Sequence, residues 1–316
     1  MTPNYDVAVI GGGPAGMTAA QYSARANLKT LVVEEMAPGG AVLLINDMEN
    51  YPGFPEPVSG YEFSEKMRIQ TERFGADFKT AAAKILVKQD DLFTIETSEG
   101  RVTARTVILS TGATHKHLGV PGEMELTGRG VSYCATCDGP FFKGKRILVV
   151  GGGDAACDEA SYLAKLSDHI VMIHRRNRFR AQKALAQRVE QNPHIDIRFN
   201  HILEEIKGEN GVSEVVLTRT DTKESYEEEM DAVFIFIGAI PQTQLVPDIE
   251  KDESGYVITN QNMETGIGGL YAAGDIRSSP FRQVVVACGE GAVAAHRASA
   301  YIDDMKGESY TVLNRV

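Results

Sequence analysis

The sequence predicts an α/β fold that contains two dinucleotide-binding units. A strand–turn–helix–strand pattern with a glycine-rich turn occupies residues 5–35, and the same pattern returns 140 residues later. The chain of 316 residues is also long enough for about two domains. This order of elements is typical of Rossmann-like domains.

The first unit begins with the apolar run YDVAVI, which leads directly into GGGPAG and then into a helix-forming segment. Its three motif glycines permit a tight turn, close approach of the backbone to a pyrophosphate, and helix–strand packing. The helix N-terminus favours phosphate, and an acid at the end of the second strand suits a ribose hydroxyl. A glycine turn without a ligand is the alternative. The candidate residues are Gly11, Gly13, Pro14, Ala15, Gly16 and Glu34.

The second unit repeats this order with KRILVV, GGGDAA, a helix and HIVMIHRR. His174 and Arg175 stand where the first unit has Glu34 and Glu35. An acid at this point repels a 2′-phosphate, whereas a basic residue accommodates one, and arginine offers a bidentate fork. The segment HRRNRFR therefore predicts NADPH, with a solvated basic loop as the alternative. The candidate residues are Gly151, Gly153, Asp154, Ala155, His174, Arg175, Arg176 and Arg180.

The composition limits the partners. With 43 acidic and 32 basic residues, the formal net charge is -11, which repels nucleic acid and offers anionic lipids no polybasic patch. No run approaches the ~18 apolar residues of a membrane-spanning helix. The N-terminal residues do not resemble an export signal, so we expect a cytoplasmic protein that binds neither nucleic acid nor membrane.

Cys134 and Cys137 form a C-x-x-C pattern, whereas Cys157 and Cys288 stand alone in helix-like segments and are expected to be buried. A zinc site needs four ligands, and the chain has no second pair, although His115 and His117 leave a Cys2His2 site as an alternative. A purely structural disulfide across so short a loop stabilises little.

A redox pair is the favoured interpretation, because this motif lies beside a nucleotide-binding unit. The C-x-x-C environment lowers the pKa of one thiol, and exchange then proceeds through a mixed disulfide. Asp138 directly follows the pair and is a candidate proton donor or acceptor, with a turn residue as the alternative.

If the second unit binds NADPH, the first unit needs a hydride acceptor, and a flavin is the natural one. A later segment supports this, since a short strand ends in Gly274 and Asp275 and a helix rich in small residues starts near Gln283. Asp275 is placed to bind a sugar-like hydroxyl, and the helix start offers its positive dipole end to an electron-rich ring. A simple helix N-cap is the alternative.

Over essentially its whole length the chain resembles the low-molecular-weight thioredoxin reductases. The resemblance is carried by motifs in a fixed order: GGGPAG, GG at 39–40, ENYPG, STGA, CATCDG, GGGDAA, HRRNRFRA, FIFIGAIPQT and AAGDIRSSPFRQ. The sequence departs from the family at Ala41, where glutamine is common, and at Asp154, where many relatives have asparagine.

The resemblance implies an FAD domain of residues 1–116 and 245–316, interrupted by an NADPH domain of residues 117–244 that carries the C-x-x-C pair. Both are expected to be three-layer ββα domains. The resemblance implies that Cys137 lies nearer the flavin, that Cys134 exchanges with a protein disulfide, and that Asp138 is the acid–base group. The candidates at the flavin end are Gly40, Asn50, Gly112, Gly274, Asp275, Arg282 and Gln283.

The family resemblance also implies a reaction, a partner and a motion. Electrons pass from NADPH through FAD and the cysteine pair to thioredoxin or a thioredoxin-like protein. The enzyme is expected to be a homodimer whose inserted domain rotates about crossings near 115–120 and 240–245. The alternatives are ferredoxin or NADH as donor, another protein disulfide as acceptor, and a non-catalytic FAD- or zinc-binding sensor.

Overall fold

The computed structural model describes residues 3–45 and 48–308 and divides the chain into two compact units. One unit comprises Met1–Thr114 together with Ile240–Val316, and the other, His115–Ala239, is inserted between these two segments. The inserted unit has a parallel sheet and the discontinuous unit a mainly parallel one, each with helices packed on it, which confirms the predicted α/β fold with two Rossmann-like domains. Within the described ranges, no helix has both the length and the apolar character needed to cross a membrane.

The discontinuous unit is built on a seven-stranded sheet with the strand order β3-β2-β1-β6-β5-β4, in which β17 also pairs with β6. Its strands are β1 (Tyr5–Ile10), β2 (Thr30–Glu34), β3 (Asp77–Thr80), β4 (Ala83–Gln89), β5 (Leu92–Thr97), β6 (Gly100–Leu109) and β17 (Leu270–Ala272). Its helices are α1 (Pro14–Arg25), the 3-10 helix η1 (Gly40–Leu44), α2 (Gly60–Arg73) and α6 (Val284–Lys306). Strands β4, β5 and β6 are antiparallel, and the remaining pairs are parallel.

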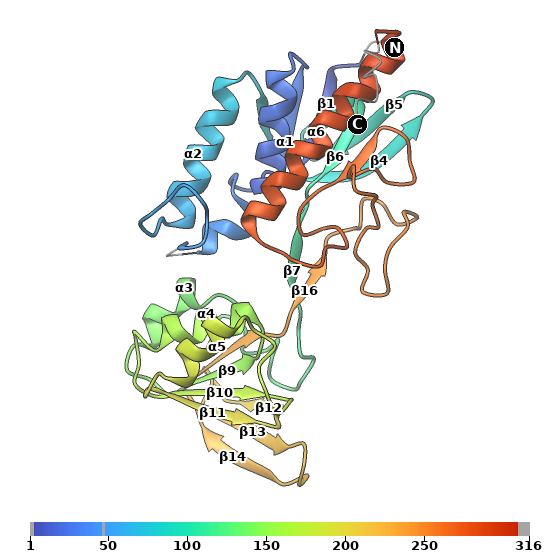
Figure 1. Ribbon diagram of the computed structural model, residues 1–316. Coiled ribbons are helices and arrows are strands. Elements are labelled where there is room, and N and C mark those ends of the chain that lie inside the picture. The colour runs from blue at the N-terminus through green and yellow to red at the C-terminus, as the bar shows by residue number, and fades with distance from the viewer. Residues whose placement is uncertain (1–2, 46–47, 309–316) are drawn as a thin grey trace. The chain divides into compact units, whose positions relative to one another are not determined.

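The central strand β1 is buried on both faces because its side chains alternate between two apolar layers. Val7 and Val9 face a core that includes alanines of α1 and α6, whereas Ala8 and Ile10 face a core that includes residues of β5. The helices α1 and α6 run side by side over the sheet (Figure 1). Glycine allows this close approach, because a Cβ at Gly291 would lie 2.1 Å from the Ala15 carbonyl oxygen.

The inserted unit has three layers. Its parallel sheet has the order β11-β10-β9-β15-β8, and a separate antiparallel sheet has the order β12-β13-β14. The strands are β8 (Val131–Ser132), β9 (Ile147–Gly151), β10 (Ile170–His174), β11 (Ile195–Phe199), β12 (His201–Lys207), β13 (Glu214–Arg219), β14 (Ser225–Glu229) and β15 (Ala232–Phe236). The helices are α3 (Ala135–Asp138), the 3-10 helix η2 (Gly139–Phe142), α4 (Asp154–Leu163) and α5 (Lys183–Glu190). Helices and antiparallel sheet cover opposite faces of the parallel sheet (Figure 1).

The chain passes between the units twice, and the two passages pair with each other. Strands β7 (Ala113–His115) and β16 (Ala239–Pro241) form a two-stranded sheet. Hydrogen bonds continue beyond both ends of the pair, from the Lys116 amide to the Gly238 carbonyl (3.0 Å) and from the Gln242 amide to the Gly112 carbonyl (2.9 Å). Gly112, one of the candidate residues, therefore lies at the end of the paired crossing.

Candidate active site

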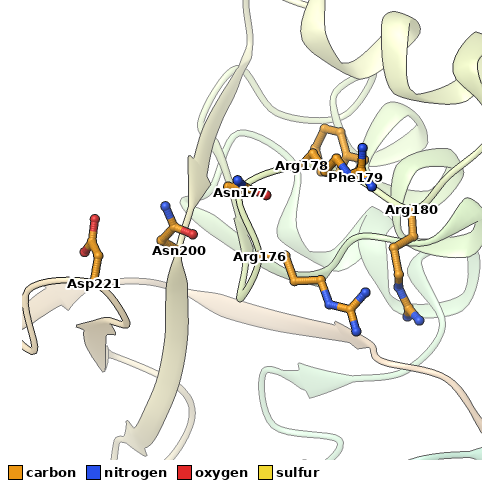
Figure 2. Close-up of a pocket in the computed structure, with 7 residues that line it drawn as sticks. All are labelled: Arg176, Asn177, Arg178, Phe179, Arg180, Asn200 and Asp221. Atoms are coloured by element: carbon orange, nitrogen blue, oxygen red, sulfur yellow. The ribbon is translucent and has the colours of Figure 1, made fainter.

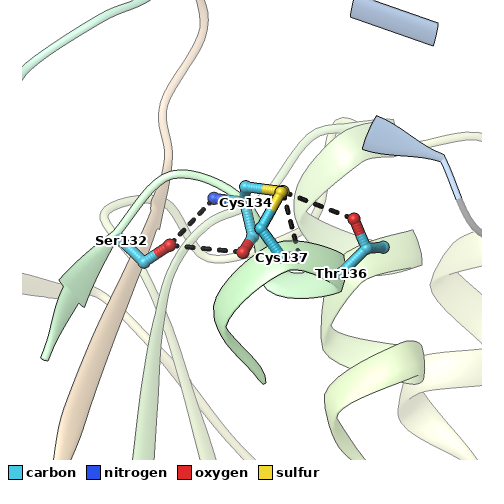
Figure 3. The surroundings of a disulfide bond; sticks show 4 residues. All are labelled: Ser132, Cys134, Thr136 and Cys137. Atoms are coloured by element: carbon cyan, nitrogen blue, oxygen red, sulfur yellow. Dashed lines mark hydrogen bonds between the residues drawn. A yellow bond between two sulfur atoms is a disulfide. The ribbon is translucent and has the colours of Figure 1, made fainter. Parts of the chain in front are cut away.

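Cys134 and Cys137 are joined by a disulfide at the start of α3, with 5.4 Å between their Cα atoms (Figure 3). The Ser132 hydroxyl accepts a hydrogen bond from the Cys134 amide (3.1 Å), and the Cys137 amide donates to Cys134 Sγ (3.1 Å). The Thr136 hydroxyl, 3.3 Å from Cys134 Sγ, must be the donor because a disulfide sulfur has no hydrogen. As whole residues, Cys134 is half-buried and Cys137 is exposed.

The disulfide weakens the zinc alternative, since a bonded sulfur is not a thiolate ligand. In residues 3–45 and 48–308, no group of three or more His, Cys, Asp or Glu side chains is arranged to hold a metal ion. His115 and His117 instead pack against the Tyr133 ring, with centroid distances of 5.7 and 4.9 Å. Cys157 and Cys288 are free and buried, which confirms the expectation for these two residues.

Asp138 ends the short helix α3. Its amide donates to the Cys134 carbonyl (3.1 Å), which closes the turn that contains both cysteines, and its side chain is half-buried. The next residue, Gly139, rests on α4, because a Cβ there would lie 2.9 Å from Leu163 Cδ2. The turn that contains the two cysteines thus packs against α4, the helix that follows the second glycine turn.

Glu159 on α4 is a carboxyl group that sequence reasoning missed. The backbone N–H of Ala135, one residue after Cys134, donates to this carboxyl group, and Glu159 Oε2 is buried without a hydrogen-bond partner among the described residues. Burial, reinforced by the neighbouring charge of Asp158, raises the pKa of Glu159 to about 7, while the Ala135 hydrogen bond opposes the shift. Nothing in the sequence distinguishes this glutamate from an ordinary surface residue of a helix.

The second glycine turn joins β9 to α4 and is packed closely at two of its three glycines. A Cβ at Gly151 would lie 2.4 Å from the Phe236 carbonyl oxygen, and one at Gly152 would lie 2.4 Å from His174 Nδ1. Gly153 is different, since a Cβ there meets nothing within 4 Å and its φ of -100° suits any residue. The protein itself does not require glycine here, so this position fits the close approach of a phosphate to the backbone.

The basic segment after β10 folds back onto this turn. The Arg180 amide donates to the Gly152 carbonyl (2.7 Å), and the Gln182 backbone and side-chain nitrogens donate to Asp154 at 2.8 and 2.7 Å. Asp154 thus holds the segment in place, while Ala155 is exposed at the start of α4. These hydrogen bonds bring the basic segment against the glycine turn, although the bonded residues are 28 positions apart.

His174 is buried, and its Nε2 atom has no partner within the described part of the chain. Burial lowers the pKa of His174, and the charges of Arg180, Arg176 and Arg175 lower it further. The ring is therefore neutral at neutral pH, and the positive charge of the segment comes from its arginines, which are exposed.

Two pockets share this segment. One, of about 830 Å³, is shown in Figure 2, where Arg176 and Arg180 point in the same direction in this view. Its lining consists of Arg176, Asn177, Arg178, Phe179, Arg180, Asn200 and Asp221. The other, of about 310 Å³, lies beside Gly151 and Gly152 and is also lined by His174, Arg175 and Arg180. Lys116, His117 and His201 line it too, and sequence reasoning missed them, as it missed Asn200 and Asp221.

The first glycine turn, between β1 and α1, is also tightly packed. Gly11 has a φ of +103°, and a Cβ there would lie 2.3 Å from the Ser110 carbonyl oxygen; one at Gly16 would lie 1.9 Å from the Gly11 carbonyl oxygen. Only Gly13 is open, with the Gly39 carbonyl oxygen 4.0 Å away. The first turn therefore has the same open middle position as the second turn, and it fits a pyrophosphate in the same way.

Neighbouring segments complete this first site. Glu34 Oε2 accepts from the Gly12 amide (2.6 Å), and the Gly39 amide donates to the Gly12 carbonyl (2.8 Å). Gly40 follows directly, and a Cβ there would lie 3.4 Å from Gly13 Cα. The structure thus places Glu34 and Gly40 beside the turn, while Pro14 occupies the first position of α1.

The segment from β17 to α6 brings the remaining candidates into the same unit. Asn50 Nδ2 donates to Gln283 Oε1 (2.9 Å) although the two residues are 233 positions apart. The Arg282 guanidinium lies 3.8 Å from the centroid of the Tyr256 ring. Burial raises the pKa of Asp275, and the Arg282 charge opposes this shift.

A buried ion pair, which sequence reasoning also missed, supports the turn at Gly274. The Gly274 amide donates to Glu290 Oε2 (2.8 Å), and Glu290 Oε1 pairs with Arg277 Nη1. Arg277 Nε also donates to the Thr259 hydroxyl (2.8 Å). The side chains of Arg277 and Glu290 are only 13% and 9% exposed, so the pair is shielded from solvent.

Comparison with known proteins agrees with this arrangement. The family model of the pyridine nucleotide-disulphide oxidoreductases matches residues 5–291. A thioredoxin reductase of Treponema pallidum is 52% identical over 306 residues, which cover 97% of this chain and 100% of that protein. One of Bacillus subtilis is 44% identical, with 96% of each chain covered. The crystal structure of Lactococcus lactis thioredoxin reductase, 40% identical, superposes with a TM-score of 0.93 over 95% of this chain and 100% of that one.

Each of the two Rossmann-like domains has a glycine turn, and one domain also carries the cysteine pair. This combination defines an oxidoreductase that uses a flavin and a pyridine nucleotide. The chain belongs to the pyridine nucleotide-disulphide oxidoreductase family. Within this family it is similar to the low-molecular-weight thioredoxin reductases, which confirms the resemblance noted in its motifs.

Proposed function

We propose that the chain is an NADPH-dependent thioredoxin-disulfide reductase that uses FAD as its cofactor. The observation that carries this proposal is the Cys134–Cys137 disulfide, which lies in the same unit as the second glycine turn and its arginine segment. A redox pair and a site for a 2′-phosphate on one unit suit an enzyme that draws electrons from NADPH. The thioredoxin reductases to which the chain is similar support thioredoxin, or a thioredoxin-like protein, as the acceptor.

We assign FAD to the discontinuous unit. The open side of Gly13 and the start of α1 suit the pyrophosphate, and Glu34 suits a ribose hydroxyl once it releases the Gly12 amide. When bound, the flavin accepts hydride from reduced nicotinamide and supplies an electron pair for the cysteine disulfide. The residues that would hold it are Gly11, Gly13, Pro14, Ala15, Gly16, Glu34, Gly40, Asn50, Gly112, Gly274, Asp275, Arg282 and Gln283.

We assign NADPH to the inserted unit. Gly151 and Gly153 with the start of α4, at Asp154 and Ala155, would hold the pyrophosphate, and the arginines would bind the 2′-phosphate. Because His174 is buried and neutral, it would serve as a hydrogen-bond partner through Nε2 rather than as a cation. Arg175, Arg176 and Arg180 would therefore carry the preference for NADPH over NADH.

The cysteines would perform the exchange with the protein substrate. Reduction of the disulfide by two electrons leaves a thiol and a thiolate after the uptake of one proton. The Cys134 thiolate attacks the substrate disulfide and forms a mixed disulfide, which Cys137 then resolves, so that the original pair is restored and the substrate leaves as a dithiol. Asp138, on the same turn, would hold or deliver the proton of the second sulfur.

The paired crossings β7 and β16 would act as the hinge about which the inserted unit rotates between the two half-reactions. We further propose that the protein is a homodimer and resides in the cytoplasm. A reducing compartment keeps the free thiols of Cys157 and Cys288 reduced and maintains the NADPH supply that such an enzyme needs.

One assay tests the proposal. Under anaerobic conditions, NADPH should bleach the flavin absorbance faster than NADH does, and thioredoxin should then be reduced. A Cys134→Ser variant should retain flavin bleaching but lose thioredoxin reduction. If NADPH leaves the flavin oxidised, the proposed donor is wrong, and reduced ferredoxin is the next donor to test.

A further inference from the structure

The contact between the redox helix α3 and helix α4 contains the carboxyl group of Glu159. The Ala135 amide, next along the backbone from Cys134, donates to this group, and Glu159 Oε2 is buried without a partner in the described part of the chain. In the same contact, a Cβ at Gly139 would lie 2.9 Å from Leu163 Cδ2 and 3.5 Å from the Tyr162 ring. Glu159 therefore contacts the redox turn through the Ala135 amide, while its Oε2 atom is shielded from solvent.

Among the residues that the structure describes, no ion pair of Glu159 is found, and its charged neighbours contact other groups. Arg188 on the adjacent helix α5 lies 3.9 Å from Asp158 Oδ1, and Asp154 is engaged by Gln182. Strands β9 and β15 bring only apolar residues and glycine to α4. The charged or titratable residues of the elements around Glu159 are Asp154, Cys157, Asp158 and Tyr162 on α4, Cys134, Cys137 and Asp138 at α3, Lys183, Arg188 and Glu190 on α5, and His174 on β10.

Reduction of the disulfide changes the electrostatics of this contact. It converts a neutral cystine into a thiol and a thiolate, so that a new negative charge arises close to the Ala135 amide. Two like charges near one amide raise each other's pKa, and a low local dielectric strengthens the effect. Since burial and Asp158 already raise the pKa of Glu159 to about 7, a modest further rise changes its protonation at neutral pH.

We propose that Glu159 is a positioning residue of the redox pair, which holds the first turn of α3 through Ala135 and takes up a proton when the disulfide is reduced. This inference rests on the proposed function, in which a reduced pyridine nucleotide supplies the electron pair. Two electrons break the S–S bond, one solvent proton forms a thiol, the other sulfur stays a thiolate, and a second solvent proton binds the Glu159 carboxylate. Exchange with a substrate disulfide restores the cystine, and the two protons balance the two thiols of the product.

The test measures the reduction equilibrium of the cysteine pair directly. FAD-loaded wild-type, E159Q and D158N proteins are equilibrated with dithiothreitol buffers between pH 5.5 and pH 8.5, and alkylated Cys134 and Cys137 are counted by mass spectrometry. The ratio of each variant's equilibrium constant to that of the wild type cancels the pH dependence of the buffer. D158N is a matched control, since it removes the same charge from the adjacent and largely exposed residue.

Glutamine is neutral at every pH and can still accept from Ala135. The ratio for E159Q should therefore be near one at pH 5.5 and rise to about three- to tenfold at pH 8.5, because one unit of pKa shift corresponds to a tenfold change. D158N should stay within about twofold over the same range. An E159Q ratio that remains within twofold overturns the proposal, and so does an equal rise for D158N.

If E159Q does not fold, infrared difference spectra of the D138N protein replace it. Asp138 cannot contribute in this variant, so reduction by dithiothreitol at pH 7 should produce the band of a newly protonated carboxyl group. Absence of that band overturns the proposal. Because the reductant is a small dithiol, none of these results depends on NADPH or thioredoxin, and failure of the proposed function leaves them interpretable.

Discussion

The buried pair of Glu290 and Arg277 should stabilise the discontinuous unit through the turn at Gly274. An E290A substitution leaves the Arg277 charge buried without its partner and the Gly274 amide without its acceptor. Because both side chains are largely buried, solvent screening is small, and the free energy of unfolding of this unit should fall by about 3–5 kcal/mol. In the double variant E290A/R277M no buried charge remains. The Gly274 amide lacks its acceptor and the Thr259 hydroxyl lacks the Arg277 donor, so the loss should fall to about 1–3 kcal/mol.

Native-state hydrogen exchange measures these losses locally. The opening free energies of amides in β17 and α6 should decrease as stated, whereas amides in β9 and β10 belong to the inserted unit and should not change. This internal control separates a local effect from global unfolding, which is needed because a chain of two units need not unfold in one step. A decrease below about 1 kcal/mol for E290A, or a double variant less stable than E290A, would refute the reasoning.

Three further predictions concern the glycine turns, Glu159 and the flavin end. G13A should lower FAD affinity at least about tenfold, and G153A should lower NADPH affinity by the same factor. Each variant should lose less than about 1 kcal/mol of stability, because both positions have room for a Cβ. Calorimetric titration of both ligands measures the affinities, and a variant that weakens FAD and NADPH equally would contradict the assignment. Because the pKa of Glu159 is raised from 4.5 to about 7 in the folded state, its protonation stabilises the fold at low pH, and this stability is lost as the pH rises between these values. E159Q should therefore be more stable than the wild type at pH 8 by up to about 3 kcal/mol and equal to it below pH 4.5, as measured by urea unfolding; equal stability at pH 8 would argue against a buried carboxyl group. N50A and Q283A should each cost less than about 1 kcal/mol of stability, because the hydrogen bond between the two side chains is exposed. The loss of FAD affinity in the double variant should differ from the sum of the two single losses. Additive losses would mean that the two side chains act independently.

Much of the architecture was predictable because its determinants are local. A strand, a glycine turn and a helix occupy about 30 consecutive residues, and their recurrence at a constant offset indicated the second unit. The cysteine pair is likewise contained in one turn, where Cys134 and Cys137 are three residues apart. Residue types at fixed spacing were sufficient for these features, because each depends on backbone geometry within a single supersecondary element.

The features that sequence reasoning missed depend on tertiary contacts. Glu290 caps the Gly274 amide from the next helix, and Asn200 lines the arginine pocket from a different strand connection. Glu159 and its neighbour Asp158 are both acidic residues of α4, and no residue pattern encodes that Asp158 is exposed whereas a carboxyl oxygen of Glu159 is buried. His174 shows the same limit, since the sequence identified the residue but not its buried and neutral state.

The central claim is that electrons from NADPH arrive at Cys134 and Cys137 before they reach thioredoxin. The most direct measurement adds one equivalent of NADPH to the FAD-loaded protein without oxygen, quenches with an alkylating reagent, and counts the labels on each cysteine by mass spectrometry. We predict label on Cys134 and Cys137, none on the buried Cys157 and Cys288, and loss of the label from the pair when oxidised thioredoxin is added before the quench. An unlabelled pair after complete oxidation of the NADPH would contradict the account.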